Sequence, residues 1–404
     1  MESITFHCKV ITPMFLAGAD GQTPELRAPS IKGAMRFWWR ALNGHLPLHE
    51  LKKKEDEIFG GTDRRSRVIL TAHYADENMN DDNVPKFNYI RDYKALDKGV
   101  KYLNILFFEY EDVKKREAIA PGVEFNVTIM SKNKEKLIEA ANVFWVMSLL
   151  GGLGTRSRRG DGSFKINKSS RKGITRDELP FYHERKGVQK LGHIQFLQKL
   201  LTLPESDETT SYSSLKWADI FFSKGSDGFS TWHDAVSDIA NKMMQIRDND
   251  TRTNIDRSAV KFTMDDMPKK AAFGLPINIR PPLQGTVNLY NQSDRTDSSL
   301  EASRRASPIV VSINRIGKNY YWTIAFLQGI FMPSSSRIKY ERNGSGNSKW
   351  EWEEEDQLLV NQFRNKLMDD WGKKTEEDLE AELDAIKYGT PVTKKPRIIK
   401  YIKL

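Results

Sequence analysis

The sequence predicts an α+β protein in which helices cover one face of antiparallel sheets, and three observations lead to this prediction. Residues 1–170 show patterns in the order strand, helix, two strands, helix, strand. The chain has 404 residues, more than one hydrophobic core usually organises, so a second domain is expected. Residues 171–404 show a looser mixture of the same patterns. We therefore expect two tandem ferredoxin-like (RRM-like) domains with insertions, in residues 1–170 and 171–404.

The first strand and the first helix have the clearest periodicity. Between positions 4 and 10, apolar side chains alternate with polar ones, which is the period of a half-buried strand. Between positions 31 and 42, apolar residues recur at helical spacing and form one stripe. Ser30 stands where a helix N-cap is expected, and Gly44 and Pro47 are expected to end the helix.

The other elements of the first unit follow from the same two periods. Alternating patterns predict strands at residues 68–74, 102–110, 123–129 and 163–168. Residues 134–150 carry apolar side chains at helical spacing and predict the second helix. This arrangement would leave one face of the sheet open for a ligand.

The second half is less regular. Helical patterns occur at residues 191–201 and 231–246. Strand patterns occur at residues 308–313, 320–330 and 397–404. Polar insertions are expected around residues 205–214 and 343–349. A second unit of the same kind fits these patterns loosely.

Cysteine content and hydropathy exclude several classes of protein. The one cysteine, Cys8, cannot form an internal disulfide or a thiolate zinc site, so we expect an inert strand residue. The longest apolar stretch, residues 140–153, is too short to span a membrane. The first residues lack the basic start of a secretory signal. We expect a cytoplasmic protein with no cofactor, no metal and no membrane partner.

The charge is distributed unevenly. The net charge is +9, but residues 351–384 carry thirteen acidic and four basic side chains, so the remainder of the chain is strongly basic. A basic body favours a nucleic-acid partner. The acidic segment could shield the basic surface or dock another protein, although a solvated pair of amphipathic helices explains it more simply.

Residues 151–160, GGLGTRSRRG, form the most informative segment, which we call the Gly-Arg loop. Glycine lacks a Cβ and allows backbone N–H groups to approach a phosphate, while arginine supplies planar charged forks for phosphate oxygens. The loop lacks the GK[ST] sequence of a nucleotide P-loop and fails the dinucleotide-binding fingerprint. The alternative is a surface turn whose arginines pair with carboxylates such as Asp161. The residues expected to bind are Gly151, Gly152, Gly154, Arg156, Arg158, Arg159 and Gly160.

The first helix also presents a basic face. Lys32, Arg36 and Arg40 recur every four residues opposite the apolar stripe, with Trp39 between them. Like charges at this spacing repel by a few tenths of a kcal/mol per pair and need a compensating anion, which a phosphate backbone would provide. Trp39 could stack on a base or pack in the core, whereas the neighbouring Phe37 and Trp38 are expected in the core.

The start of this helix has features of an anion-binding cup. Gly33 in the first turn costs about 1 kcal/mol of helix propensity relative to alanine, which favours the close approach of a ligand there. Arg27 ahead of the helix and Ser30 as its cap would complete the cup. Contact between the helix and a sheet would also explain Gly33.

Three motifs resemble those of a known family. They are the segment from Arg27 to Arg40, the Gly-Arg loop continued by DGSF, and the sequence RRASPI that starts at Arg304. Together they resemble the RAMP superfamily of CRISPR systems and, more narrowly, the first-named Cmr subunits of type III-B effector complexes. The first two motifs anchor the resemblance in residues 1–170, and the second half matches only through the third.

This resemblance implies two tandem RRM-like folds and a non-catalytic role in an RNA-guided ribonucleoprotein of antiviral defence. The implied partners are the guide RNA near its 3′ end, the target RNA and other RAMP subunits. The family's RNA-facing surface carries over onto the basic helix and the Gly-Arg loop. Because the first sheet shows no clear aromatic pattern for base stacking, we expect recognition of the RNA backbone.

Two rival functions remain open. Relatives in the superfamily include metal-independent ribonucleases that process guide RNA, and these need a histidine near the 2′-OH. His7, His45 and His49 are the candidates, but Pro47 disfavours a regular helix through the last two, and no nearby ligand completes a metal set. The other rival is a purely structural assembly subunit with incidental basic charge.

Overall fold

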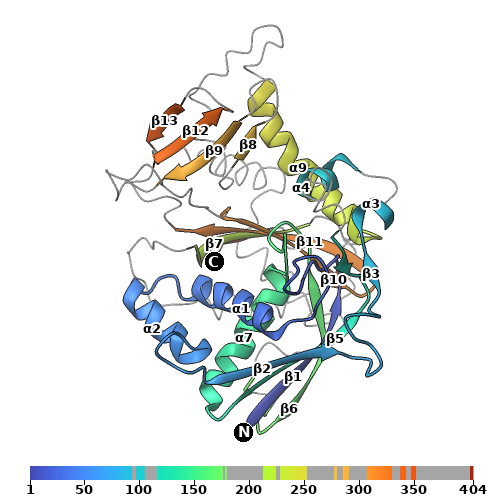
Figure 1. Ribbon diagram of the computed structural model, residues 1–404, viewed down its shortest axis with the longest axis vertical. Coiled ribbons are helices and arrows are strands. Elements are labelled where there is room, and N and C mark those ends of the chain that lie inside the picture. The colour runs from blue at the N-terminus through green and yellow to red at the C-terminus, as the bar shows by residue number, and fades with distance from the viewer. Residues whose placement is uncertain are drawn as a thin grey trace, which may run out of the picture.

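The computed structural model places two four-stranded antiparallel sheets on either side of a pair of helices (Figure 1). It describes residues 1–92, 97–104, 116–175, 178–179, 213–223, 228–252, 277–279, 285–290, 307–329, 337–342, 347–351 and 401–403. Helices and antiparallel sheets together confirm the predicted α+β class.

The first sheet has the strand order β2-β5-β1-β6, with every neighbouring pair antiparallel. Its strands are β1 (Glu2–Val10), β2 (Val68–Tyr74), β5 (Glu124–Ser131) and β6 (Phe164–Lys172). One face of β1 is buried and the other is partly exposed, as the alternation of its side chains predicts. Strand β6 continues past residue 170, and the domain division expected there stays a prediction.

Helix α1 (Ala28–Leu42) begins earlier than predicted. Arg27 is its N-cap residue, and Pro29 lies in the first turn, so Ser30 is inside the helix and does not cap it. Proline fits this position because its missing N–H has no partner in the first turn of a helix. The predicted apolar stripe is confirmed, since Ile31, Met35 and Trp38 are buried.

The sequence patterns missed helix α2 (Leu48–Phe59). Pro47, which was expected only to end α1, is the N-cap residue of α2. The helix buries Leu51, Ile58 and one carboxylate, that of Glu55, and it packs against α1. This packing places an acidic helix beside the basic face of α1.

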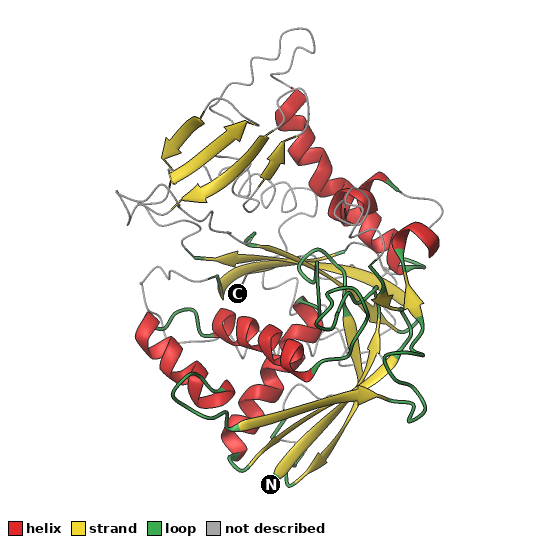
Figure 2. Ribbon diagram, viewed as in Figure 1, coloured by secondary structure: helices red, strands yellow, loops and turns green. Residues whose placement is uncertain are grey.

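Helix α7 (Lys134–Leu150) has the predicted bounds and lies between the two sheets (Figure 2). Asn133 caps its N-terminus by accepting a hydrogen bond from the Lys136 N–H. The helix is apolar around most of its circumference in its second half, and such a helix is stable only when buried. It contacts strands of both sheets, so one core joins the two halves of the chain.

The second sheet has the strand order β10-β11-β7-β14, again antiparallel throughout. Its strands are β7 (Ser214–Phe222), β10 (Ile309–Ile316), β11 (Asn319–Gln328) and β14 (Tyr401–Lys403). Helix α9 (Trp232–Arg252) follows β7 and packs against β11. The patterns predicted α9, β10, β11 and part of β14, whereas they missed β7.

Smaller elements complete the described chain. A third antiparallel sheet contains β8 (Ile277–Ile279), β9 (Gly285–Tyr290), β12 (Arg337–Arg342) and β13 (Asn347–Glu351). The other elements are β3 (Lys86–Phe87), α3 (Tyr89–Asp92), α4 (Lys98–Asn104) and β4 (Ala118–Ile119). The strand predicted at residues 102–110 is wrong where it overlaps α4, and the rest of that segment lies outside the described residues.

Several predictions concern residues that the structure does not describe. They are the helix at 191–201, the RRASPI motif up to Ala306, and the acidic segment after Glu351. None of the described helices is both long enough and apolar enough to cross a membrane.

Candidate nucleic-acid interface

The Gly-Arg loop follows α7 directly and is held by close backbone contacts. A Cβ on Gly154 would lie 2.4 Å from the Phe15 carbonyl oxygen, and one on Gly151 would lie 2.6 Å from Nε1 of Trp38. Gly154 and Gly160 have φ angles of +88° and +94°, in the region that favours glycine. The glycines therefore fix the shape of the loop.

These contacts correct the role expected for the glycines. Gly151, Gly152 and Gly160 are buried. A Cβ on Gly152 would lie 2.8 Å from the backbone of Asp161 and Gly162, so Gly151 and Gly152 allow close internal packing, whereas Gly160 is required by its positive φ. Burial of these three positions turns them toward the protein interior and away from a phosphate. Only Gly154 of the four is half-buried.

The three arginines of the loop are all half-buried. Arg156 has a φ of +64°. Among the residues that the structure describes, it is the one non-glycine residue with a positive φ. The backbone of the next two arginines is tied to strand β10 of the second sheet, because the Arg158 carbonyl accepts a hydrogen bond from the Val311 N–H at 3.0 Å and Arg159 forms a β-bridge with Val311. These contacts fix the conformation of the loop beside the second sheet.

The loop and α1 meet, as the sequence interpretation requires. The Cζ of Arg158 lies 3.9 Å from the centre of the Phe37 ring, a cation–π contact. Gly33 lies one turn before Phe37 on the same side of the helix, is exposed, and has no atom within 4 Å of the place a Cβ would take. This side of α1 is therefore open next to the arginines.

The other basic residues of α1 have protein partners. The Glu55 Oε1 atom accepts hydrogen bonds from Arg36 Nε and from Arg40 Nη1, each at 2.6 Å. Arg36 also donates to Asp56 Oδ1 at 3.2 Å and to the Gly60 carbonyl at 2.7 Å. The compensating anion that was expected to be a phosphate is therefore supplied largely by α2.

Lys32, Arg27 and Trp39 are also placed by internal contacts. Lys32 Nζ donates to Ser66 Oγ at 2.8 Å, and burial and the neighbouring Arg36 lower the pKa of this lysine. Arg27 pairs with Glu25 at 3.3 Å across a partly exposed surface. Trp39 is 1% exposed and donates from Nε1 to Glu139, which corrects its assignment as a residue that contacts RNA.

A buried carboxyl group lies at the end of the loop. Asp161 is buried and accepts a hydrogen bond from the Tyr89 hydroxyl at 2.6 Å. Burial raises the pKa of Asp161 to about 8, although the Tyr89 hydrogen bond and the charge of Arg156 act in the opposite direction. At neutral pH this carboxyl group is therefore mostly protonated, and it carries little negative charge toward the loop.

Sequence reasoning missed the acidic partners in α2. Glu55 lies four residues after Leu51 and three before Ile58, so it occupies the apolar stripe of its helix. A carboxylate on such a stripe needs a buried cationic partner, and this signal could have identified the contact with Arg36 and Arg40.

The candidate histidines form no described metal site. His7 lies on the partly exposed face of the first sheet, with Nδ1 2.7 Å from Asn126 Oδ1 and Nε2 3.2 Å from Ser170 Oγ. His45 is half-buried before α2, and His49 is exposed in its first turn. Within the described ranges, no three His, Cys, Asp or Glu side chains are grouped to hold a metal ion.

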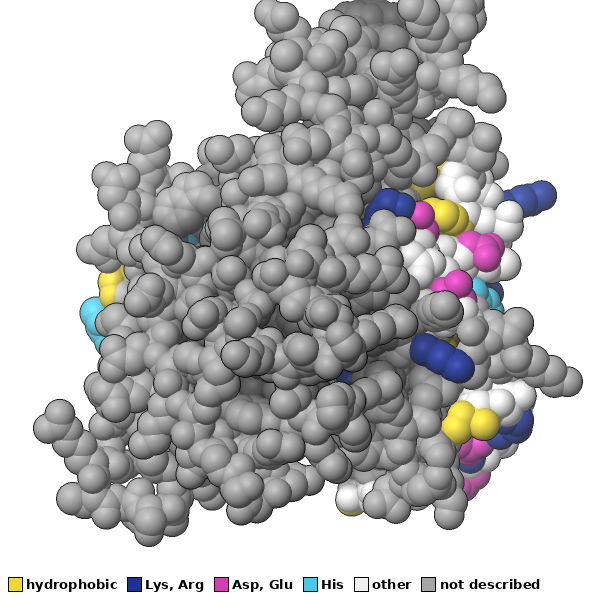
Figure 3. Space-filling model, turned by 90° about the horizontal axis from the view of Figure 1, so that it is seen from above, with side chains coloured by type: hydrophobic (Ala, Val, Ile, Leu, Met, Phe, Trp, Pro, Cys, Tyr) yellow, Lys and Arg dark blue, Asp and Glu magenta, His cyan; other side chains and the backbone are white. Residues whose placement is uncertain are grey.

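Charges are mixed among the described side chains at one rim of the face seen from above. In Figure 3, dark-blue Lys and Arg side chains at the right-hand rim lie beside magenta Asp and Glu side chains. The side of α1 next to the Gly-Arg loop is different, because its first turn contains no acidic residue.

Comparison with known proteins identifies the family. Residues 7–165 match the RAMP superfamily. The CRISPR system Cmr subunit Cmr1-2 of Pyrococcus furiosus is 32% identical over 186 residues, which cover 41% of this chain and 96% of the relative. Subunit Cmr1-1 of the same organism is 29% identical over 346 residues, covering 81% of this chain and 88% of the relative.

Solved structures show the same fold. The crystal structure of apo Cmr1 from Pyrococcus furiosus has a TM-score of 0.54 at 22% identity and covers 90% of this chain and 97% of that one. A chain in the cryo-EM structure of the type III-B Cmr-beta complex bound to cognate target RNA has a TM-score of 0.51 at 13% identity. The match covers 90% of this chain and 99% of that one. From its sequence relatives, this chain belongs to the RAMP superfamily and, within it, to the Cmr1 family of CRISPR subunits.

Proposed function

We propose that this protein is a non-catalytic RNA-binding subunit of a type III-B CRISPR effector ribonucleoprotein. It binds guide and target RNA near the 3′ end of the guide through phosphate contacts, and it assembles with other RAMP subunits. The observation that carries the proposal is the contact between Arg158 and Phe37, because it joins the Gly-Arg loop to the open side of α1. The names of the Cmr1 relatives support the assembly.

The geometry of this surface suits a phosphate. Helix α1 has no side-chain cap and no acidic residue in its first turn, so the positive end of its dipole is not neutralised by its own residues. Gly33, in the second turn, leaves room beside the start of the helix. Arg158 contacts α1 from the loop, and its neighbours Arg156 and Arg159 add two more charged forks that suit phosphate oxygens. The proposed surface consists of these arginines and the first turn of α1, with Arg27 and Lys32 at its edge.

The fold supports a duplicated architecture. In the first and second sheets, the strands lie in the order second, third, first, fourth along the chain. This is the order of a ferredoxin-like unit. We therefore propose two such units, with the small third sheet as an insertion in the second unit, and with the division near residue 170.

RNA affinity of a loop variant tests the function. Replacing Arg156, Arg158 and Arg159 by alanine is expected to weaken binding to single strands of unrelated sequence alike. The slope of log K against log salt should become shallower by about 0.7 per lost phosphate contact. The matched control replaces Lys52, Lys53 and Lys54, three exposed lysines of α2, and removes the same charge.

Two outcomes would contradict the proposal. An equal loss of affinity in both variants would mean that net charge alone attracts RNA. Unchanged affinity in the loop variant, with weakened binding to partner subunits, would favour a purely structural subunit.

A further inference from the structure

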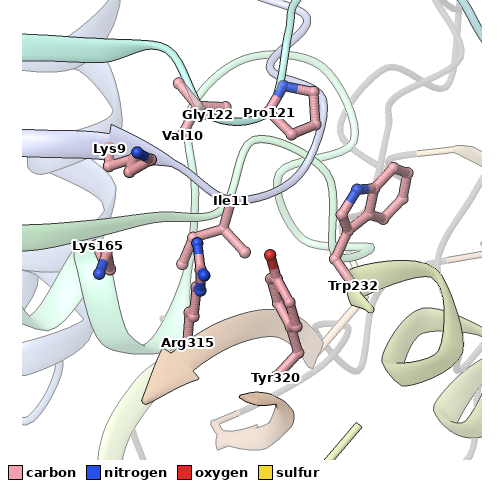
Figure 4. Close-up of a pocket in the computed structure, with 9 residues that line it drawn as sticks. All are labelled: Lys9, Val10, Ile11, Pro121, Gly122, Lys165, Trp232, Arg315 and Tyr320. Atoms are coloured by element: carbon pink, nitrogen blue, oxygen red, sulfur yellow. The ribbon is translucent and has the colours of Figure 1, made fainter. Parts of the chain in front are cut away.

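A cavity of about 200 Å³ opens between the first and second sheets, and no residue of the Gly-Arg loop is among its lining residues (Figure 4). Its charged lining residues are Lys9, Lys165 and Arg315, and its aromatic ones are Trp232 and Tyr320. We call it the intersheet pocket. A water molecule takes about 30 Å³ of liquid, so the pocket has room for a phosphate group and several waters.

Two pairs of neighbouring residues on adjacent strands build the pocket. Lys9 on β1 is opposite Lys165 on β6, and Arg315 on β10 is opposite Tyr320 on β11. Residues opposite each other on adjacent strands point to the same face of a sheet. In Figure 4, the two lysines lie on one side, Tyr320 and Trp232 lie on the other, and Arg315 lies between them. The register of two sheets therefore fixes the arrangement.

The cations of the pocket outnumber the carboxylates that contact them. Lys9 Nζ lies 3.1 Å from Glu124 Oε1, and the Glu124 side chain is about half exposed. In the described part of the chain, neither Lys165 nor Arg315 has an ion pair, and the Arg315 Nε atom is buried without a hydrogen-bond partner. Burial, Arg315 and Lys9 lower the pKa of Lys165, although the charge of Glu124 acts in the opposite direction. A bound anion would reduce the repulsion among the three cations and would accept a hydrogen bond from Arg315 Nε.

The mixture of groups indicates a nucleotide. An arginine fork and two lysines suit the oxygens of a phosphate group. Aromatic rings beside such a group suit the attached nucleoside, since a base can stack on a ring. The Arg315 Cζ atom lies 5.2 Å from the centre of the Tyr320 ring, so the two chemistries are adjacent.

We propose that the intersheet pocket binds one phosphate group of a nucleotide. Lys9, Lys165 and Arg315 contact its oxygens, and Tyr320 packs against the attached nucleoside. The nucleotide can be free or part of an RNA strand, because the recognised chemistry is the same. In the second case, the proposal rests on the proposed function and adds a second contact to it.

Binding of AMP to the full chain tests the pocket independently of RNA. Calorimetric titration is expected to show that AMP binds, that inorganic phosphate competes with it, and that adenosine binds much more weakly. The double variant Lys165→Gln, Arg315→Gln should lose about tenfold or more in AMP affinity, the range expected when hydrogen bonds to a charged group are removed. The Arg315→Lys variant keeps the charge but loses the planar guanidinium, so its AMP affinity should lie between those of the wild type and the double variant.

A matched control removes the same charge at exposed positions outside the pocket. Lys172 and Lys318 are exposed, at the end of β6 and in the turn between β10 and β11. Replacing both by glutamine should leave AMP affinity unchanged. Circular dichroism and thermal unfolding of all variants show whether the fold is retained.

A labelled single-stranded RNA distinguishes the two sources of the phosphate. Weaker RNA binding by the Lys165→Gln, Arg315→Gln variant, with a salt slope shallower by about 0.7, would place an RNA phosphate in the pocket. Loss of AMP binding with unchanged RNA binding would assign the pocket to a free nucleotide. If the variant matches the wild type for both ligands, the proposal is wrong. The proposed function would still stand if the loop variant loses RNA affinity.

Discussion

The guanidinium carbon of Arg158 lies 3.9 Å from the centre of the Phe37 ring and connects two segments that are far apart in the sequence. The ring is itself supported from one edge by Trp38, with the ring centres 5.4 Å apart. A guanidinium over an aromatic face is attracted by the negative face of the ring. Phe37 therefore holds one charge of the loop against the middle of α1.

Replacing Phe37 by leucine tests this role. The change keeps most of the apolar volume but removes the cation–π contact, which is worth about 0.5–1 kcal/mol at partly exposed sites. A loss of about 0.5–1 kcal/mol corresponds to a fall in RNA affinity of about two- to fivefold, and this is the expected result. If Phe37 acts through Arg158, the same change in an Arg158→Ala background should cause no further loss. Fluorescence anisotropy with a double-mutant cycle measures this, and additive losses would contradict it.

Glu55→Gln tests whether α2 is the counterion of α1. The carboxylate is 5% exposed and accepts hydrogen bonds from Arg36 and Arg40, each about one-third exposed. Removing its charge leaves two arginines without their main partner, so the free energy of unfolding is expected to fall by about 2 kcal/mol, less than for a fully buried pair. Urea denaturation measures the change.

Glu57→Gln is the control for this prediction. Glu57 lies on the same helix and pairs with Arg64 on a more exposed surface, so its replacement should cost less than about 1 kcal/mol. RNA affinity should change little in either variant. If Glu55→Gln instead left stability unchanged, Arg36 and Arg40 would not depend on α2 for compensation.

The buried carboxyl group of Asp161 predicts a pH dependence of stability. Its pKa is about 8 in the folded protein, against an ordinary value of 3.8 for an aspartate side chain, so the folded state binds the proton more tightly. The protonated Asp161 therefore adds its full contribution to the free energy of unfolding below about pH 4. This contribution falls as the pH rises and stops falling above about pH 8. The slope in this window approaches about 1.4 kcal/mol per pH unit.

Two variants check the assignment to Asp161. Asp161→Asn keeps an acceptor for the Tyr89 hydroxyl and is always neutral, so its unfolding free energy should depend less on pH between 4 and 8. Tyr89→Phe removes the hydrogen bond that lowers the pKa of Asp161 and should extend the sloping window upward. Denaturant unfolding at a series of pH values measures both slopes. An unchanged slope in Asp161→Asn would assign the effect to other groups.

The helices between the sheets could be predicted because local signals agreed with the tertiary contacts. Helix α7 has a capping Asn133, a continuous apolar sequence and a glycine after its last residue, and all three place its bounds. Helix α2 could not be predicted in this way. Its lysines and acids are typical of a solvated segment, and only contact with α1 shows why Glu55 is buried.

The candidate site was only partly predictable for a similar reason. The sequence shows that arginines occur in the loop and on α1. It does not show which partners the α1 arginines have, because these depend on which helix packs against α1. The intersheet pocket shows the limit more clearly, because Lys9 and Arg315 come from strands of different sheets. No periodicity or motif in the sequence relates those two positions. They come together only because the two sheets pack against each other.

Gly33→Ala separates stability from RNA binding at the start of α1. The position is exposed and helical, and a Cβ there would meet no atom within 4 Å, so alanine should stabilise the protein by about 1 kcal/mol through helix propensity. If an RNA phosphate approaches this turn closely, the added methyl group should weaken RNA binding severalfold despite the higher stability. Thermal unfolding and anisotropy on the same preparation measure the two effects. Higher stability with unchanged affinity would remove the side of α1 around Gly33 from the proposed interface and leave the loop arginines as its remaining part.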